Sequence, residues 1–169
     1  ALADGTIRRI LVIGQGTAAV AGGAVSRALE AELAGMAPSR SIDVEDCPAT
    51  ELAGFGLASD MSDTLVVAIS QSGTTTDTNR TVDLVRARGA LVVAIVNRRT
   101  SDLVDRADGV LYTSDGRDVE MSVASTKAFY AQAVAGNLLA VAVADAAGAP
   151  GSPDRSELLA GLRDLPEAM

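Results

Sequence analysis

Hydroxyl side chains are concentrated in residues 70–78 (SQSGTTTDT), which follow an apolar run of strand length and precede a stretch of helical character. Six of these nine residues carry a hydroxyl group, and Gly73 lies among them. The first N–H groups of a helix lack partners inside the helix and carry a partial positive charge, so hydroxyl donors beside them can help to hold an anion. Helix capping alone would need one or two of these hydroxyls. The segment therefore predicts a phosphate-binding loop that contains no basic residue.

A second loop, residues 14–19 (GQGTAA), matches the G-x-G-x-x-A form of the dinucleotide-binding fingerprint. That fingerprint expects an acidic residue about 20 positions later for the ribose hydroxyls. The acidic residues that we expect to end the second strand, Asp43, Glu45 and Asp46, lie 29, 31 and 32 positions after the first glycine. Two interpretations stay open: a nicotinamide-dinucleotide site built on the two glycines, or a plain turn from strand to helix.

A third segment that could carry chemistry begins at Glu120 and precedes a long helical stretch. Ser122 and Ser125 are three residues apart, which places two hydroxyls and the Glu120 carboxylate around the start of that helix. Lys127, the single lysine, either forms a local ion pair or faces a ligand. Glu120 would serve as an acid or base only with a raised pKa.

The composition excludes several classes of site. The 169 residues contain no histidine and one cysteine, which removes histidine bases, zinc ribbons and internal disulfides. Cys47 is expected to be an inert buried thiol, and neither a metal site nor a cofactor is predicted. A net charge of -8 and 2% aromatic residues argue against nucleic acid as a partner.

A membrane is not an expected partner either. The longest apolar run, residues 134–147, is shorter than a membrane helix and is interrupted by Gly136, Asn137 and Asp145. The N-terminus carries no signal-peptide pattern, so a cytoplasmic location is expected.

Apolar runs alternate with helical segments along the chain. Continuous apolar strands are typical of a parallel sheet with helices on both faces, so a doubly wound α/β domain of about five strands is predicted. The expected strands are Ile7–Ile13, Ile42–Cys47, Thr64–Ile69, Ala90–Val96 and Gly109–Tyr112. The expected helices are Ala18–Gly35, Thr75–Arg88, Ser101–Asp108, Ser122–Ala147 and a tail near Arg155–Leu165, with a glycine-containing linker from Pro48 to Gly56.

Residues 70–73 (SQSG), then Asp77 and Thr78, and residues 123–129 (VASTKAF) about fifty positions on, resemble the first sugar isomerase (SIS) domain of the glucosamine-6-phosphate synthase family. The resemblance runs from about residue 7 to residue 147. It implies a three-layer α/β/α sandwich with a five-stranded parallel sheet, a single SIS domain over residues 1–150, and a linker with a helical tail over residues 151–169.

The resemblance also implies a set of residues that bind the phosphate and hydroxyls of the sugar, and no catalytic residue. The binding set is Thr17, Ser70, Gln71, Ser72, Thr75, Val123 and Ser125, with Gly16, Glu120 and Lys127 as possible auxiliaries. Two positions depart from the family pattern: Ala18 replaces a serine, and Thr74 replaces a glutamate. Both departures bear on which sugar phosphate is bound.

The expected function is that of a sugar-phosphate-binding lobe of an isomerising glutamine:fructose-6-phosphate amidotransferase, with fructose 6-phosphate or glucosamine 6-phosphate as ligand. The resemblance implies that the parent protein adds a glutaminase domain and a second SIS domain, which supplies the lysine, glutamate and histidine for isomerisation. The chain alone is then expected to show no turnover and to form a homodimer. The alternative is a non-catalytic SIS module that senses a phosphosugar and regulates a partner.

Overall fold

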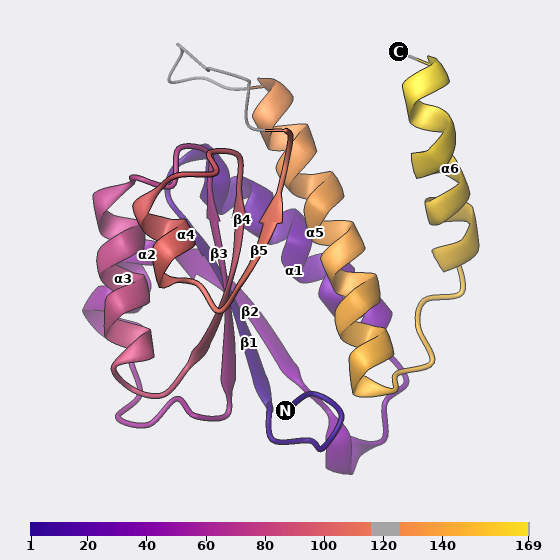
Figure 1. Ribbon diagram of the computed structural model, residues 1–169. Coiled ribbons are helices and arrows are strands. Elements are labelled where there is room, and N and C mark those ends of the chain that lie inside the picture. The colour runs from indigo at the N-terminus through magenta and orange to yellow at the C-terminus, as the bar shows by residue number, and fades with distance from the viewer. Residues whose placement is uncertain (116–125, 169) are drawn as a thin grey trace.

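The protein folds into a five-stranded sheet between two layers of helices, as a computed structural model describes it for residues 1–115 and 126–168 (Figure 1). The strands are β1 (Arg9–Gly14), β2 (Asp43–Pro48), β3 (Thr64–Ser70), β4 (Leu91–Val96) and β5 (Gly109–Tyr112). The helices are α1 (Thr17–Leu33), α2 (Ala49–Glu51), α3 (Thr76–Arg86), α4 (Asp102–Arg106), α5 (Thr126–Ala147) and α6 (Arg155–Ala168). A 3₁₀ turn spans Pro38–Arg40, and a π turn over Leu52–Gly56 continues α2. All four strand pairings are parallel, in the order β2-β1-β3-β4-β5, which confirms the predicted fold class.

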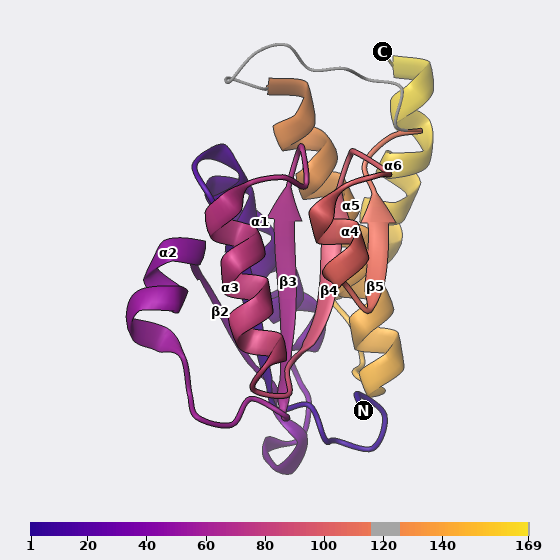
Figure 2. The ribbon, with the colours of Figure 1, turned by 60° about the vertical axis from the view of Figure 1, so that its left-hand side comes forward.

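Helices cover both faces of the sheet, and each face has its own apolar core. Alternate residues of a strand point to opposite faces, so Val12 packs toward α1 and α5 while its neighbour Leu11 packs toward α2, α3 and α4. Figure 2 shows α3 and α4 in front of the sheet, with α1 and α5 behind it. Every residue of the central strand β3 is buried, as its unbroken apolar run predicts.

Strand β2 differs from the prediction in its chemical character. It lies at the edge of the sheet, and most of its side chains are exposed. Asp43, Glu45 and Asp46 lie at its start and middle, with Cys47 and Pro48 at its end. The expectation that these acidic residues end the strand is therefore wrong.

The expected linker from Pro48 to Gly56 contains helical turns instead of irregular chain. Ala49 and Leu52 are buried in the core, and the Thr81 hydroxyl donates a hydrogen bond of 2.9 Å to the Ala49 carbonyl. Contacts with α3 thus hold this segment in place. These contacts join residues far apart in the chain, so the local sequence of the segment does not predict them.

Helix α5 is the one described helix that is long and apolar enough to cross a membrane by length and composition, a test that core helices also pass. In the fold it packs along α1. Gly136 faces Val25 so closely that a Cβ on the glycine would lie 3.0 Å from Val25 Cβ and closer still to Val25 Cγ2. The apolar composition of α5 is therefore explained by its place in the core.

An ion pair ties the C-terminal helix α6 to the rest of the domain. The Arg155 guanidinium contacts the buried Glu32 carboxylate of α1 at 2.8 Å and Asp145 of α5 at 2.6 Å. The Ser152 N–H also donates to Glu32, at 3.2 Å. These bonds fix the turn between α5 and α6.

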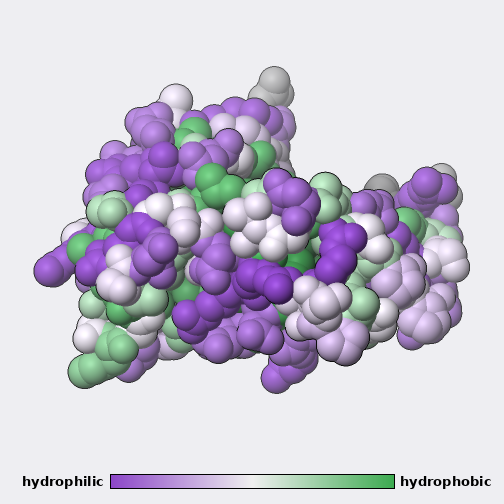
Figure 3. Space-filling view, turned by 90° about the horizontal axis from the view of Figure 1, so that it is seen from below, coloured by the Kyte–Doolittle hydropathy of each residue, from purple (hydrophilic) through white to green (hydrophobic). Residues whose placement is uncertain are grey.

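The two ends of the sheet differ in the loops that they carry. Seen from below, at the amino ends of the strands, the surface is mostly hydrophilic, with scattered apolar residues (Figure 3). The loops that the sequence singles out follow β1 and β3 and lie at the opposite, carboxyl edge. Helix α5 also begins at that edge (Figure 1).

Candidate functional site

The order in which the chain adds strands reverses between β1 and β3, because β2 lies on one side of β1, whereas β4 and β5 follow on the other side of β3. In open parallel sheets, ligands bind outside the carboxyl ends of the strands at such a switch point. The register pairs Ile13 of β1 with Ala68 of β3, so the loops that follow both strands leave the sheet side by side. The topology brings the glycine loop and the hydroxyl loop to this point.

Hydrogen bonds within the β3–α3 loop give it a defined shape. Ser70 is 2% exposed, and its hydroxyl accepts a hydrogen bond from the Gly73 N–H at 3.0 Å. The same hydroxyl lies 3.3 Å from the Thr75 hydroxyl. Ser72 accepts two hydrogen bonds from Thr74, one from its N–H at 3.2 Å and one from its hydroxyl at 3.0 Å.

Helix capping does not account for these hydroxyls. Thr75 is the N-cap residue of α3, but its side chain makes no capping hydrogen bond. The first N–H groups of α3 therefore keep their capacity to donate to an anion, in a partly positive environment. The loop combines these donors with the hydroxyls of Ser72 and Thr75.

The following loop, between β4 and α4, supports the hydroxyl loop. The Asn97 N–H donates to the Gln71 carbonyl at 3.3 Å, and the Leu103 N–H donates to the Gly73 carbonyl at 3.0 Å. The Asn79 side-chain amide of α3 donates to the same Gly73 carbonyl at 3.1 Å. Gly73 has a φ of 66° and packs against Ser101. Sequence reasoning missed the part played by Asn97, Asn79 and Ser101; the one signal was a polar residue directly after an apolar strand.

In the β1–α1 loop, backbone geometry accounts for both glycines. A Cβ on Gly14 would lie 2.7 Å from the Ala18 carbonyl carbon, so helix α1 starts too close to the strand for any other residue. Gly16 has a φ of 59°, in the left-handed region that favours glycine. Thr17 is exposed in the first turn of α1.

A dinucleotide site at this turn is not supported by the fold. The strand order differs from the 3-2-1-4-5-6 order typical of dinucleotide-binding domains. The carboxyl end of β2, where the ribose-binding acid is expected, carries Cys47 and Pro48. Glu45 lies in the middle of that strand and pairs with Arg9 at 2.7 Å.

Two glutamine side chains at the switch point have unsatisfied oxygen atoms. Gln15 directly follows β1 and Gln71 directly follows β3, and each buries its Oε1 atom without a hydrogen-bond donor. Thr78 Oγ1 and Asn79 Oδ1 of α3 are in the same condition. A buried polar atom without a partner costs about 1–3 kcal/mol, so such atoms call for an explanation.

The structure brings together part of the predicted binding set. Thr17 lies at the start of α1, beside the loop that carries Ser70, Gln71, Ser72 and Thr75. The predicted residues Glu120, Val123 and Ser125 lie outside the described residues. Lys127 is exposed in the first turn of α5.

Neither metal chemistry nor thiol chemistry is indicated at this edge. Among residues 1–115 and 126–168, no three His, Cys, Asp or Glu side chains are placed to hold a metal ion. Cys47 is half-buried, and burial, together with Asp46 and Glu45, raises the pKa of its thiol. A raised pKa keeps the thiol protonated and therefore unreactive.

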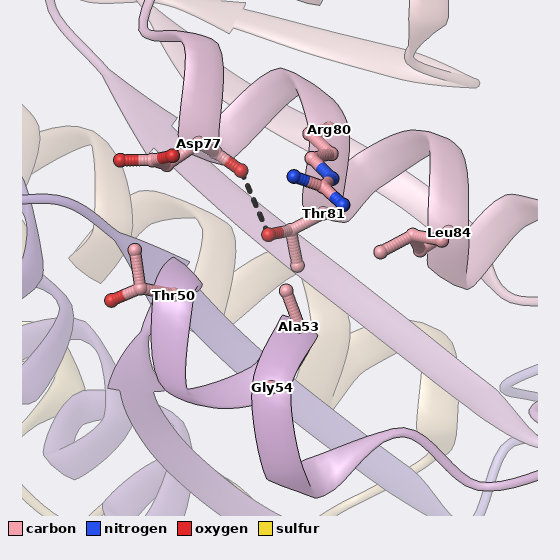
Figure 4. A pocket seen from close by; sticks show the side chains of 7 residues that line it. All are labelled: Thr50, Ala53, Gly54, Asp77, Arg80, Thr81 and Leu84. Atoms are coloured by element: carbon pink, nitrogen blue, oxygen red, sulfur yellow. Dashed lines mark hydrogen bonds between the residues drawn. The ribbon is translucent and has the colours of Figure 1, made fainter.

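A separate surface pocket of about 240 Å³ lies between the α2 segment and α3 (Figure 4). None of its seven lining residues belongs to the predicted binding set: they are Thr50, Ala53, Gly54, Asp77, Arg80, Thr81 and Leu84. The Thr81 hydroxyl donates to the Asp77 carbonyl at 2.8 Å within α3.

Comparison with known proteins gives a consistent set of relatives. The family model described as SIS domain matches residues 6–142. The chain is 40% identical over 163 residues to a protein of Symbiobacterium thermophilum named glutamine–fructose-6-phosphate aminotransferase (isomerizing), covering 95% of this chain and 25% of that protein. A protein of the same name from Corynebacterium glutamicum is 48% identical over 104 residues, covering 62% of this chain and 16% of that protein.

A solved structure shares the fold. The C-terminal domain of glucosamine-fructose-6-phosphate aminotransferase from Francisella tularensis matches with a TM-score of 0.79 and 25% identity, covering 96% of this chain and 43% of that chain. The chain spans a quarter or less of the length of the two curated relatives described above.

Proposed function

The chain belongs to the SIS domain family, and from that premise we propose that it binds a phosphorylated sugar at the carboxyl edge of its sheet. Its relatives carry the name of an isomerising aminotransferase that acts on fructose 6-phosphate. The ligand we propose is fructose 6-phosphate or the product glucosamine 6-phosphate. The chain would then be the substrate-binding lobe of such an enzyme.

The single observation that carries this proposal is the uncapped, hydroxyl-lined start of α3 at the switch point. A phosphate there would accept hydrogen bonds from the first N–H groups of α3 and from the hydroxyls of Ser72 and Thr75. Ser70 is buried and bonded to Gly73, so its role is to hold the loop in shape as much as to touch the ligand. No basic residue is needed, which fits a chain with a net charge of -8.

The neighbouring residues would complete the site around the sugar. Gly16 and Thr17 lie between β1 and the first turn of α1, next to the same switch point, and would contact the sugar phosphate from there. The Gln71 side-chain oxygen has no donor and would accept one from a sugar hydroxyl. Contacts from Val123 and Ser125, and auxiliary roles for Glu120 and Lys127, stay predictions.

The proposed lobe binds without catalysing. The chain has no histidine, and no catalytic residue is assigned to it. Ring opening, isomerisation and ammonia supply would come from a second SIS domain and a glutaminase domain of the parent protein. Residues 1–150 would form the SIS domain and residues 151–169 the linker and helical tail that lead to the second one.

Titration calorimetry with fructose 6-phosphate tests the proposal. We expect saturable binding that Ser72→Ala and Thr75→Val both weaken, and no comparable heat with NAD. The matched control is Thr100→Val, an exposed threonine in the β4–α4 loop that the proposal does not use. Binding of NAD without a response to the sugar phosphate would refute the proposal.

A second candidate function is a non-catalytic SIS module that senses a phosphosugar and regulates a partner. The observation that favours it is the hydrogen bond from the Thr74 hydroxyl to Ser72, since the family pattern has a glutamate at the position of Thr74. Ala18 likewise lacks the hydroxyl of the family's serine. A parent reading frame without a glutaminase domain would favour this candidate.

Homodimer formation and a cytoplasmic location are parts of the same proposal. Val20 of α1 and Tyr130 and Leu138 of α5 are large apolar side chains exposed on the helix layer that those two helices form. Sedimentation at working concentration is expected to show a dimer, and a monomer would contradict that part.

A further inference from the structure

Gln15 is the residue of the switch point that the proposed binding set leaves out. It directly follows β1, and its Oε1 atom is buried without a hydrogen-bond donor in the described structure. Its side chain as a whole is partly exposed. The terminal torsion of a glutamine side chain is broad, so rotation about it can turn the amide oxygen toward a ligand bound at the switch point.

The donors and the acceptors in the loops after β1 and β3 suit different parts of a phosphosugar. The start of α3 and the hydroxyls of Ser72 and Thr75 offer donors, which suit the acceptor oxygens of a phosphate. The amides of Gln15 and Gln71 offer oxygens that lack donors. A bare phosphate dianion at neutral pH has little to donate to these oxygens, whereas a polyhydroxylated phosphate ester has several O–H groups.

Resting on the proposed function, we infer that Gln15 is a sugar-recognition residue: its side-chain oxygen accepts a hydrogen bond from a hydroxyl or amino group of the bound phosphosugar. Gln15 thereby distinguishes a phosphorylated sugar from phosphate alone. The backbone carbonyl of the same residue accepts a hydrogen bond from the Ala18 N–H at 3.3 Å and so fixes the first turn of α1. The side chain is free of that structural task.

The test compares two ligands, fructose 6-phosphate and inorganic phosphate, on the full chain by titration calorimetry. Gln15→Met keeps the length of the side chain and removes the amide. We expect a 3- to 10-fold loss of affinity for fructose 6-phosphate, the size of about one hydrogen bond, and less than a 2-fold change for inorganic phosphate. Gln15→Ala serves as a second variant, with thermal melting to confirm that each variant folds.

Thr64→Val is the matched control, because it removes a buried hydroxyl from a side chain that is 2% exposed and lies at the amino end of β3, at the opposite edge of the sheet from the proposed site. It is expected to leave both affinities unchanged.

The outcomes separate the inference from the proposed function. Unchanged affinity of Gln15→Met for fructose 6-phosphate overturns the inference and leaves the proposed function standing. An equal loss for both ligands also overturns it, because Gln15 would then act on the loop and not on the sugar. A wild-type chain that binds inorganic phosphate but not fructose 6-phosphate refutes the proposed function itself.

Discussion

Gly73 lies against Ser101 so tightly that a Cβ on the glycine would be 2.6 Å from Ser101 Cβ and closer still to Ser101 Oγ. The glycine also has a φ of 66°, and its N–H and carbonyl both take part in hydrogen bonds that shape the loop after β3. The proposed phosphate loop therefore depends on the position of the neighbouring β4–α4 loop.

Gly73→Ala is expected to prevent the loop between β3 and α3 from adopting its observed conformation. The substitution combines a strained φ with a steric clash, so we expect a loss of at least 2 kcal/mol in the free energy of unfolding and a loss of fructose 6-phosphate binding. Gly148→Ala is the control, because Gly148 has a φ of 70° with open space around it. It should cost about 1 kcal/mol and leave binding intact. Equal destabilisation by the two changes in urea unfolding would contradict the steric argument.

Ser70→Ala should destabilise the chain more than Ser72→Ala does. Ser70 accepts the N–H of the buried Gly73, and removing it leaves that donor unsatisfied at a cost of about 1–3 kcal/mol. Ser72 is partly exposed, and water can replace it as the acceptor for Thr74. We expect Ser72→Ala to cost less than about 1 kcal/mol in urea unfolding. The reverse order would show that Ser70 does not hold the loop.

Asp108 should make the free energy of unfolding depend on pH in the acidic range. Burial by itself would raise the pKa of its carboxyl, but hydrogen bonds from Arg86 at 2.7 Å and from the Val92 N–H at 2.8 Å outweigh burial and lower it. A lowered pKa contributes stability that is present above the unfolded value of 3.8 and is lost as the pH falls through the folded value.

Asp108→Asn is therefore expected to cost about 1 kcal/mol at pH 7, a figure kept low because the side chain is 39% exposed. Its difference from wild type should shrink as the pH falls below about 4. Asp105→Asn, on the exposed surface of α4, is the control and should change little. Urea unfolding at several pH values measures both, and a difference that grows in acid would contradict the assigned cause.

The Arg155 ion pairs should contribute more to the stability of the fold than a surface ion pair does. Arg155→Ala leaves the buried carboxylate of Glu32 with one neutral donor, the Ser152 N–H, whereas Arg9→Ala removes one partner of the exposed Glu45. We expect Arg155→Ala to lower the melting temperature clearly more than Arg9→Ala. Equal melting temperatures of the two variants would mean that the contacts of Arg155 contribute no more stability than the surface pair of Arg9 and Glu45.

Periodicity predicted the central elements because it reflects burial. The apolar run from Thr64 onward and the glycine at its end are local signals, and the structure places β3 and the following loop where they predict. The glycine-rich turn after β1 was equally local, but two interpretations fitted it. The strand order, and the presence of Cys47 and Pro48 at the carboxyl end of β2, favour the simpler one, a turn from strand to helix.

The supports of the site could not be predicted, because they depend on which strands become neighbours. The Asn97 N–H can donate to the Gln71 carbonyl because β3 and β4 are neighbours in the sheet. Glu32 and Arg155 are 123 residues apart, so no local pattern connects them. The unpartnered oxygen of Gln15 likewise becomes visible only when the atoms around it are placed.

The central claim is that a phosphorylated sugar binds between the loops after β1 and β3. Amide NMR spectra of the uniformly ¹⁵N-labelled chain, titrated with fructose 6-phosphate, test it most directly. We expect the shifted signals to be concentrated on the amides of residues 15–17 and 71–78. Shifts concentrated on residues 50–54 and 80–84, which line the α2–α3 pocket of Figure 4 outside the predicted range, or no shifts at ligand concentrations that saturate the calorimetric signal, would contradict it.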